Sequence, residues 1–411
     1  MKTIAVIVSC DTKYKEACYI RQCLELSGVQ ALLVDISIGL QEPQGSAEMP
    51  RRTVLSEAGI SWEEVCGQTK GELMELMTEA VRFCVLKLHH ERKIDGVLAV
   101  GGVQNTTVAT TAMQALPIGF PKVMATTIAC GQKPFGSVVG DKDIVVIPSI
   151  SDFTGLNPMT ELIIANACAC VAGMALYAGK ELKKGARPLV GITLMGITNT
   201  GACAAVEELE RAGIGAIGFH STGVGGRIME QLALDGILDG ILDLTTHEIT
   251  SEYFGGGFSF GGNNRLIAPL KQGVPFVACP GGLDFVDFAK HEFPPRMDQR
   301  LYNMHNGTLA HIKILPDEAK EIGAIFAGRL NQALDGVRLL LPTNGMRKNA
   351  DKGGNLYAPE TDKALLDSIL DNIGENVQVQ WIEGNLNEEN WGKQAAHAIM
   401  DEMKRKGRIP C

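Results

Sequence analysis

IAVIVSCDTKYKEACYIRQCLELSGVQALLVD, the segment from Ile4 to Asp35, places two apolar runs on either side of one amphipathic stretch. The runs Thr3–Ser9 and Gln30–Asp35 have the length and the branched apolar residues of buried strands, and Tyr14–Ser27 has the length of a helix. Gly28 stands where that helix must end. A strand, a helix and a second strand in this order predict a βαβ unit and therefore a parallel sheet.

The same unit recurs in the second half of the chain. VGITLMGITNTGACAAVEELERAGIGAIGFH (Val190–His220) aligns with the first segment with one gap, so that Gly28 matches Gly213. Unrelated βα units also share Val/Ile runs that end in glycine, so chance similarity is the alternative. Three matches in the same order favour an old duplication: Ile4–Asp35 with Val190–His220, Ile94–Gly102 with Leu238–Thr246, and Lys122–Gly131 with Pro275–Asp284.

Alternation of strands and helices continues along the whole chain. Further strands are predicted at Ile94–Val100, Lys122–Thr126, Ile144–Ile147, Leu189–Met195, Gly215–His220, Gly240–Leu244, Pro275–Cys279, Ala310–Leu315, Val337–Leu341 and Val377–Ile382. Further helices are predicted at Glu72–Arg92, Asn105–Leu116, Pro158–Gly179, Gly201–Ala212, Gly226–Asp235, Arg265–Gln272, Pro316–Ala333, Glu360–Asn372 and Glu388–Lys406.

The charged segment Glu181–Pro188, with its Gly and Pro, is the expected domain boundary. The sequence thus predicts an α/β fold of two doubly wound, Rossmann-like parallel-sheet lobes, residues 1–184 and 187–411, with a cleft between them.

Composition limits the classes of partner and compartment. The net charge of -9 over 411 residues argues against nucleic acid, because a phosphate backbone requires concentrated Lys and Arg. Eleven cysteines without a C-x-x-C pair indicate a reducing, cytoplasmic location without structural disulfides. The apolar runs fall short of the ~18 residues that a membrane span needs, so no membrane association is expected.

Polar residues follow the strand tips of the first half, where open α/β sheets bind ligands. Small residues at these turns, with the exposed N–H groups of the following helix, suit a phosphate or a carboxylate. An ordinary capped turn is the alternative. The candidate binding residues here are Asp11, Thr12 and Lys13 after the first strand, and Gly101, Gly102, Asn105 and Thr106 after the third.

The second half carries the denser motif FHSTGVGGRIME, Phe219–Glu230. It lacks the last glycine of G-x-G-x-x-G, which is Ile228 here, and the chain contains no G-x-x-x-x-G-K-[ST] sequence. Either an anion site or a tight turn fits this motif. The candidate binding residues are Ser221, Thr222, Gly223, Gly225, Gly226 and Arg227, with Thr245, Thr246, Gly281 and Gly282 at the next strand tips.

Candidate acid–base residues also lie at strand ends. His247, Glu248 and His220 are the expected catalytic group. A metal site would have to gather His220, His247, Glu248, Asp284, His291 and His305 without any H-x-x-x-H spacing, so none is predicted. A covalent hydrolase using Ser221 or Cys279 with His247 lacks the G-x-S-x-G elbow.

Several of these motifs together resemble a known family. They are DTK (Asp11–Lys13), FHSTGVGGRIMEQL (Phe219–Leu232), DLTTHEI (Asp243–Ile249), PGGLDFVDF (Pro280–Phe288) and the closing SILDNIG and GNLNEENW segments. The chain, from Lys2 to about Lys406, is similar to the family of the ATP-binding N-terminal inhibitory domain of the tomato mosaic virus resistance protein, which has uncharacterised bacterial members. The resemblance implies two α/β subdomains, a homodimer and ATP binding, and antiviral inhibition does not carry over.

Three functions follow as alternatives. The first is an ATP-binding protein, extending to an ATP-dependent enzyme acting on a small anionic metabolite, with Asp11, Glu248 or Asp284 as candidate ligands of Mg²⁺. The second is a non-nucleotide hydrolase or lyase that uses His220 or His247. The third is a regulatory protein that binds a ligand without chemistry.

Overall fold

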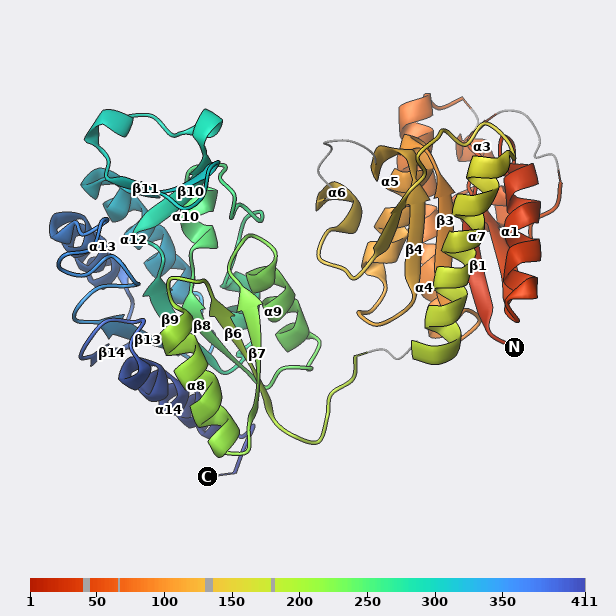
Figure 1. The fold of residues 1–411 in the computed structure, drawn as a ribbon. Coiled ribbons are helices and arrows are strands. Elements are labelled where there is room, and N and C mark those ends of the chain that lie inside the picture. Colours follow the sequence, from red (N-terminus) through yellow and green to blue (C-terminus); the bar gives the residue numbers. More distant parts are fainter. Residues whose placement is uncertain (40–44, 66, 130–135, 179–181, 411) are drawn as a thin grey trace. The chain divides into compact units, whose positions relative to one another are not determined.

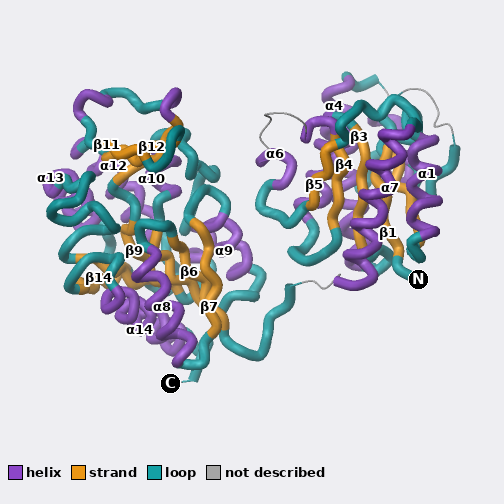
Figure 2. Tube along the Cα trace, viewed as in Figure 1, coloured by secondary structure: helices purple, strands orange, loops and turns teal. Residues whose placement is uncertain are grey.

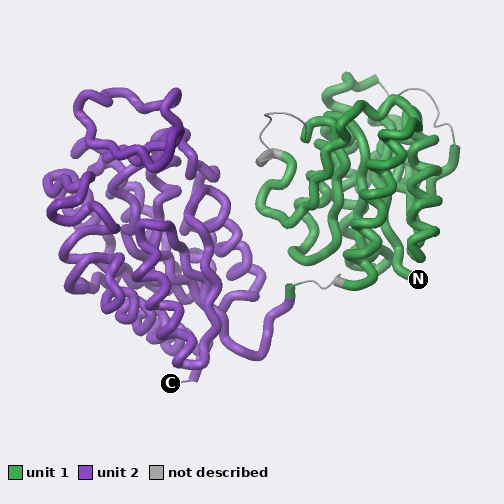
Figure 3. Tube along the Cα trace, in the orientation of Figure 1, with its two compact units in different colours: residues 1–182 green, residues 183–411 purple. Residues whose placement is uncertain are grey.

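The computed structural model describes residues 1–39, 45–65, 67–129, 136–178 and 182–410. Three expected boundaries fall outside these ranges: the end of a matched segment at Gly131, the end of a helix at Gly179 and the start of the boundary segment at Glu181. The chain forms two compact units, unit 1 at Met1–Leu182 and unit 2 at Lys183–Cys411 (Figure 3). The cleft expected between them stays a prediction.

Within its described residues, unit 1 is a five-stranded parallel sheet with helices on both faces (Figures 1 and 2). Its strands are β1 Thr3–Val8, β2 Gln30–Asp35, β3 Gly96–Gly101, β4 Lys122–Thr126 and β5 Val145–Pro148, in the order β2-β1-β3-β4-β5. Its helices are α1 Tyr14–Leu26, α2 Arg51–Glu57, α3 Trp62–Val65, α4 Lys70–His90, α5 Val103–Ala115, α6 Gly136–Val139 and α7 Pro158–Gly173, with a 3-10 turn η1 at Thr127–Ala129 and a π turn η2 at Met174–Ala178.

Two apolar layers hold this sheet. One face packs on α2, α4 and α5 through residues such as Val54, Val81 and Met113, and the other packs on α1 and α7 through Ile20 and Ile164. Strands buried on both faces explain why each reads as a continuous apolar run in the sequence.

Unit 2 contains a larger parallel sheet within its described residues. Its strands are β6 Leu189–Leu194, β7 Gly215–His220, β8 Gly240–Thr245, β9 Phe276–Gly281, β13 Val337–Pro342 and β14 Val377–Ile382, in the order β14-β13-β9-β8-β6-β7. Its helices are α8 Asn199–Arg211, α9 Gly225–Leu234, α10 Glu248–Tyr253, α11 Ile267–Lys271, α12 Pro316–Leu330, α13 Pro359–Asn372 and α14 Glu389–Arg405, with 3-10 turns η3 at Lys290–Glu292 and η4 at Met297–Gln299. Helices α8 and α14 cover one face, where Trp391 is fully buried.

The two sheets share one topology. In unit 1 the order β2-β1-β3-β4-β5 corresponds strand for strand to β7-β6-β8-β9-β13 in unit 2. The segments matched in the sequence, β1 with β6, β2 with β7, β3 with β8 and β4 with β9, therefore occupy equivalent places. This is the arrangement expected of a duplicated unit, and it puts a switch point between β1 and β3, and again between β6 and β8.

One predicted strand does not join the parallel sheet. The strand expected at Ala310–Leu315 is β12, Leu309–Lys313, and it pairs antiparallel with β10 (Phe285–Ala289) and β11 (Tyr302–Met304) in a three-stranded sheet. The connection from β10 back to β12 contains no crossover helix in the described residues, and strands joined in this way pair antiparallel. The long loop expected before it contains η3, η4 and β11.

One stretch, Pro158–Tyr177, is long and apolar enough to cross a membrane by length and composition among the described residues. It comprises α7 and most of η2. The helix packs on the parallel sheet, where Ile164 and Cys168 are fully buried, and core helices of this kind meet the same criterion. The stretch is therefore weak evidence for a membrane.

Candidate functional site

A pocket of ≈ 400 Å³ opens at the switch point of unit 1. It lies at the carboxyl ends of β1 and β3, where open α/β sheets bind their ligands. Five of the residues predicted from the first half line it together: Asp11, Thr12, Lys13, Gly102 and Asn105. Its other lining residues are Ser9, Ile38, Val103, Gln104, Asp152, Phe153 and Thr154.

The loop after β1 is held in place by Asp35 at the end of β2. The buried Asp35 carboxylate accepts hydrogen bonds from the backbone N–H groups of Cys10 and Ser37, each at 3.0 Å, and from the Ser37 hydroxyl. Ser37 Oγ in turn accepts from the Asp11 N–H at 2.9 Å, and Asp11 Oδ2 accepts from the Gly39 N–H at 3.2 Å. Asp11 is thereby fixed at the rim of the pocket.

The first glycine at the end of β3, Gly101, packs too closely against Asn105 to carry a side chain. A Cβ on Gly101 would stand 2.6 Å from Asn105 Cβ. Asn105 accepts from Ser9 Oγ at 2.9 Å and donates to the Val100 carbonyl at 3.2 Å, so its amide joins the two loops. Thr106 is buried beneath them, bonded to Thr126 Oγ1 at 2.6 Å, and does not line the pocket.

Positive potential at the pocket comes from Lys13 and from two helix ends. The Lys13 ammonium donates to the Phe153 carbonyl, which keeps it at the wall. Helices α1 and α5 begin there without a side-chain cap on their first N–H groups. Those groups lack helical acceptors and carry the positive end of the helix dipole, so they favour an anion. Asp11 and Asp152 add oxygen ligands suited to Mg²⁺.

The predicted motif of unit 2 also converges, but its polar groups bond to one another. Ser221 Oγ donates to Glu248 Oε2 at 2.6 Å and to the Thr245 carbonyl, and the Gly226 N–H donates to Glu248 Oε1 at 3.2 Å. The side chain of Glu248 thus takes the place that an external anion would have at the N-terminus of α9. Thr246 Oγ1 bonds the Cys279 carbonyl at 3.0 Å.

The glycines of this motif serve close packing of the protein itself. A Cβ on Gly226 would stand 2.1 Å from Arg265 Nε, and one on Gly225 would stand 2.1 Å from the His220 carbonyl. At Gly223 it would meet the Phe260 carbonyl at 2.9 Å. The other predicted residues lie around this loop. Thr222 bonds His220, and Arg227 is half-buried on the first turn of α9. A Cβ on Gly281 would stand 2.2 Å from the Leu244 carbonyl, and Gly282 has a φ of 75°.

Beneath the motif, one buried arginine faces three carboxylates. Arg265 contacts Asp243 at 2.9 Å, Glu230 at 3.1 Å and Glu248 at 3.8 Å. Burial, which outweighs the attraction of Arg265, raises the pKa of Asp243 to about 7, and burial also raises the pKa of Glu230. The cluster therefore binds a proton near neutral pH.

The three predicted catalytic residues have different surroundings. His247 is fully buried, with Nδ1 2.8 Å from the Gly282 carbonyl and Nε2 3.3 Å from Asp287 Oδ1. Burial opposes its charged form, but Asp287 raises the pKa of His247, and the same pair lowers the pKa of Asp287 to about 2. Glu248 is committed to Ser221 and Gly226, whereas His220 is exposed. A hydrolase or lyase that uses these groups stays a prediction.

The switch point of unit 2 is filled. In the sequence alignment Ser9 and Asp11 of unit 1 correspond to Met195 and Ile197, and these two pack on Phe285 in an apolar cluster. The Lys348 N–H also donates to the Ile197 carbonyl at 2.8 Å, so a later loop lies against the same turn. Of the two equivalent edges, the polar one is therefore in unit 1.

Several lining residues escaped the sequence prediction. Ser9 and Gln104 are neighbours of predicted residues, and their strand-tip positions were a usable signal. Asp152, Phe153 and Thr154 follow β5, a strand predicted correctly but without its trailing loop. Among the described residues, no group of three or more His, Cys, Asp or Glu side chains is placed to hold a metal by itself.

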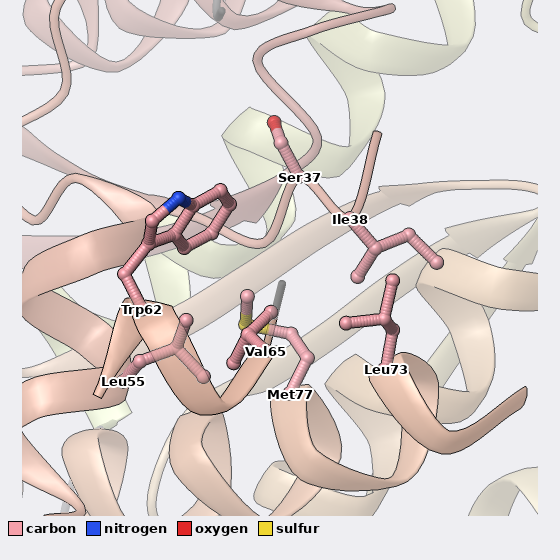
Figure 4. Close-up of a pocket in the computed structure, with 7 residues that line it drawn as sticks. All are labelled: Ser37, Ile38, Leu55, Trp62, Val65, Leu73 and Met77. Carbon is pink, nitrogen blue, oxygen red and sulfur yellow. The ribbon is translucent and has the colours of Figure 1, made fainter. Parts of the chain in front are cut away.

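A second cavity in unit 1 is small and apolar. It measures ≈ 10 Å³, and Figure 4 shows Leu55, Val65 and Met77 gathered between Trp62 and Ile38. A space of this size holds at most one water molecule, and a water needs polar partners. The cavity is a packing gap behind Ile38, and it is no candidate site.

The chain is a two-unit α/β protein with Rossmann-like parallel sheets and a polar pocket in the first unit. The chain belongs to the UPF0261 family. Residues 2–180 match the N-terminal domain, and residues 187–403 the C-terminal domain, of "Uncharacterised protein family (UPF0261)".

Relatives in two kingdoms are similar over nearly the whole chain. A UPF0261 protein of Clostridium tetani is 33% identical over 98% of this chain and 100% of its own. The ToMV resistance protein Tm-1(GCR237) of Solanum lycopersicum is 30% identical over 98% of this chain, which spans 56% of that protein. A solved structure, a putative UDP-N-acetylglucosamine 2-epimerase from Listeria monocytogenes, covers 99% of this chain and 97% of its own at 12% identity with a TM-score of 0.22, too low to carry any argument about activity.

Proposed function

We propose that this chain is a nucleotide-binding protein whose pocket in unit 1 holds ATP with Mg²⁺. One observation carries the proposal: two uncapped helix ends and Lys13 line or adjoin a ≈ 400 Å³ pocket at the switch point between β1 and β3. Pockets of this volume suit a small molecule, and switch points are where doubly wound sheets bind nucleotides.

The phosphates would face the first turns of α5 and α1. The N–H groups of Val103, Gln104 and Asn105 begin α5, and each dipole contact contributes about 0.3–1 kcal/mol when exposed. Two helix ends together with Lys13 supply several such contacts. Gly102 leaves the approach open, because among the described residues a Cβ there would meet Thr127 Oγ1 alone, at 3.6 Å.

The acidic residues of the pocket would require a cation between them and the phosphates. Asp11 and Asp152 outnumber Lys13, so a bare polyphosphate would be repelled. Mg²⁺ is commonly held by one or two carboxylates together with phosphate oxygens, and this pair offers that donor set. The identity of the base as adenine comes from the family resemblance. In its wider form, the proposal is that the protein is a homodimeric, cytoplasmic, ATP-dependent enzyme that acts on a small anionic metabolite.

Calorimetric titration of the full chain with ATP, with Mg²⁺ and with EDTA, tests this function. Binding is expected only with Mg²⁺, and Lys13→Ala should weaken it at least tenfold. Lys15→Ala is the matched control, because Lys15 lies on α1 two residues after Lys13, is exposed and does not line the pocket. Absence of heat and of a thermal shift at millimolar Mg²⁺·ATP would overturn the proposal, as would equal effects of the two lysine substitutions.

A further inference from the structure

Unit 2 contains a second pocket, of ≈ 440 Å³, away from the predicted motifs. It lies at the carboxyl end of β13 and beside the edge strand β14, with α13 as one wall. This strand end is not the switch point of the sheet, which lies between β6 and β8, so the case for a site here rests on the pocket itself. Its volume falls in the range typical of small-molecule sites.

Half-exposed aromatic and aliphatic side chains form one side of this pocket. Trp381 on β14 is 49% exposed, Tyr357 before α13 is 39% exposed, and Leu370 on α13 is 36% exposed. Large apolar groups left in water at a concave surface commonly mark a binding site. An aromatic ring of this kind accepts either an apolar body or a cation on its face.

The acidic residues of the pocket differ in whether they are already paired. Asp367 pairs with Lys363 one helical turn away, and Asp362 accepts from Lys313 Nζ at 2.5 Å. Asp351 makes no side-chain hydrogen bond or ion pair in the part of the chain that the structure describes. After these pairs are counted, the lining retains one uncompensated negative charge, at Asp351.

A chain of buried charges supports the pocket from behind. Arg347 Nε donates to Asp284 at 2.8 Å, and Lys313 Nζ bridges Asp284 Oδ2, at 2.6 Å, to Asp362. Asp284 and Lys313 are almost completely buried, and the desolvation cost of their charges is offset by these mutual ion pairs and hydrogen bonds. The chain is neutral as a whole and ends at Asp362, on the pocket wall. It fixes the carboxylate side of the pocket without adding net charge.

We infer that this pocket is a second ligand site, which takes a small organic monocation: a protonated amine at Asp351 with an apolar body against Trp381. The charge at Asp351 favours a cation over a neutral molecule of the same shape, and the half-exposed Trp381 ring offers a surface for an apolar body. Anionic molecules such as nucleotides are disfavoured there. This inference does not rest on the nucleotide proposal.

Three probes of one shape and different charge test it: benzylammonium, benzyl alcohol and benzoate, each titrated calorimetrically into the full chain. Benzylammonium is expected to bind at least tenfold more tightly than benzyl alcohol, and benzoate more weakly than both. Asp351→Asn should remove the preference for the amine over the alcohol. Trp381→Leu should weaken both probes, with Trp381→Phe as the milder variant if the first fails to fold.

Asp371→Asn is the control, because Asp371 is an exposed aspartate of the wall helix α13 that does not line the pocket. Lys13→Ala should leave the amine titration unchanged, which separates this site from the one in unit 1. Equal affinity for amine and alcohol in the unsubstituted chain, an unchanged preference in Asp351→Asn, or no benzylammonium binding at millimolar concentration would each overturn the inference.

Discussion

Asp11 and Ile197 stand at the same place in the two copies of the repeated unit, three residues beyond the last residue of β1 and of β6. Asp11 lines the open pocket of unit 1, whereas Ile197 is 8% exposed and packs with Met195 and Phe285. One switch point is therefore polar and accessible, and its counterpart is apolar and filled.

Exchanging these two residues should have opposite consequences. Asp11→Ile is expected to abolish the dependence of ATP binding on Mg²⁺ while leaving the melting temperature within a few degrees, because Asp11 is only half-buried. Ile197→Asp places an unpaired carboxylate in an apolar cluster and should lower the free energy of unfolding by about 3 kcal/mol or more. Calorimetry and urea denaturation measure the two effects. A stable Ile197→Asp protein would contradict the filled switch point.

The neighbouring glycines of the unit 1 pocket should also separate binding from stability. Gly102→Val adds a side chain whose Cβ would meet, within the described parts of the chain, Thr127 Oγ1 at 3.6 Å and nothing nearer, so the fold should survive while ATP affinity falls at least tenfold. Gly101→Ala forces a contact of 2.6 Å with Asn105 and should cost about 1–3 kcal/mol of stability. Thermal melts and ATP titrations of both variants test this difference. Loss of stability in Gly102→Val but not in Gly101→Ala would contradict it.

Glu248 is expected to act as a structural cap on α9. Glu248→Ala removes the acceptor of the Gly226 N–H, one acceptor of Ser221 Oγ and the most distant of the three carboxylates around Arg265, so the free energy of unfolding should fall by about 1–3 kcal/mol. Glu248→Gln keeps an acceptor and should cost less. Nucleotide affinity in unit 1 should not change in either variant that folds. Unchanged stability accompanied by lost turnover would return Glu248 to a catalytic role.

Asp243 should give stability an unusual dependence on pH. Its folded pKa, about 7, lies above the unfolded value of about 3.9, so the folded state binds the extra proton. Its contribution is fully present below pH 4 and is lost as pH rises through 7, with a slope of at most about 1.4 kcal/mol per pH unit. Urea denaturation between pH 4 and 8 should show this decline, and Asp243→Asn should flatten it. A parallel decline in the variant would rule out Asp243 as its source.

The pair of His247 and Asp287 should behave as a buried ion pair. Asp287→Ala leaves His247 without its carboxylate and Ser259 without its acceptor, and should cost about 3–5 kcal/mol. His220→Ala is the control, since His220 is exposed and its imidazole bonds the nearby Thr222 hydroxyl. Urea denaturation at pH 7 measures the free energy of unfolding of the two variants. A stability loss of similar size in both would contradict the difference in burial.

Apolar runs and glycines in the sequence were enough to predict the fold class and most element positions. Central parallel strands such as β3 and β8 are buried along their whole length, so their signal is local and continuous. The antiparallel β10 and β11 were not predicted, because short strands outside a βαβ unit lack that signal. Helix α10 was missed because its six residues follow directly on a strand tip.

Sequence by itself determined the repeat, the two parallel sheets and the loops that reach the strand tips, since each depends on the order of residues close together in the chain. Only the tertiary structure decided which of those loops are open. Glu248 meets Ser221 and Gly226, and Asp35 meets Cys10, across 22 to 27 residues of chain, so a polar side chain is free or committed according to partners brought together by folding. For that reason the richer motif, in unit 2, is bonded to itself, and the plainer Asp11–Lys13 turn lines a pocket.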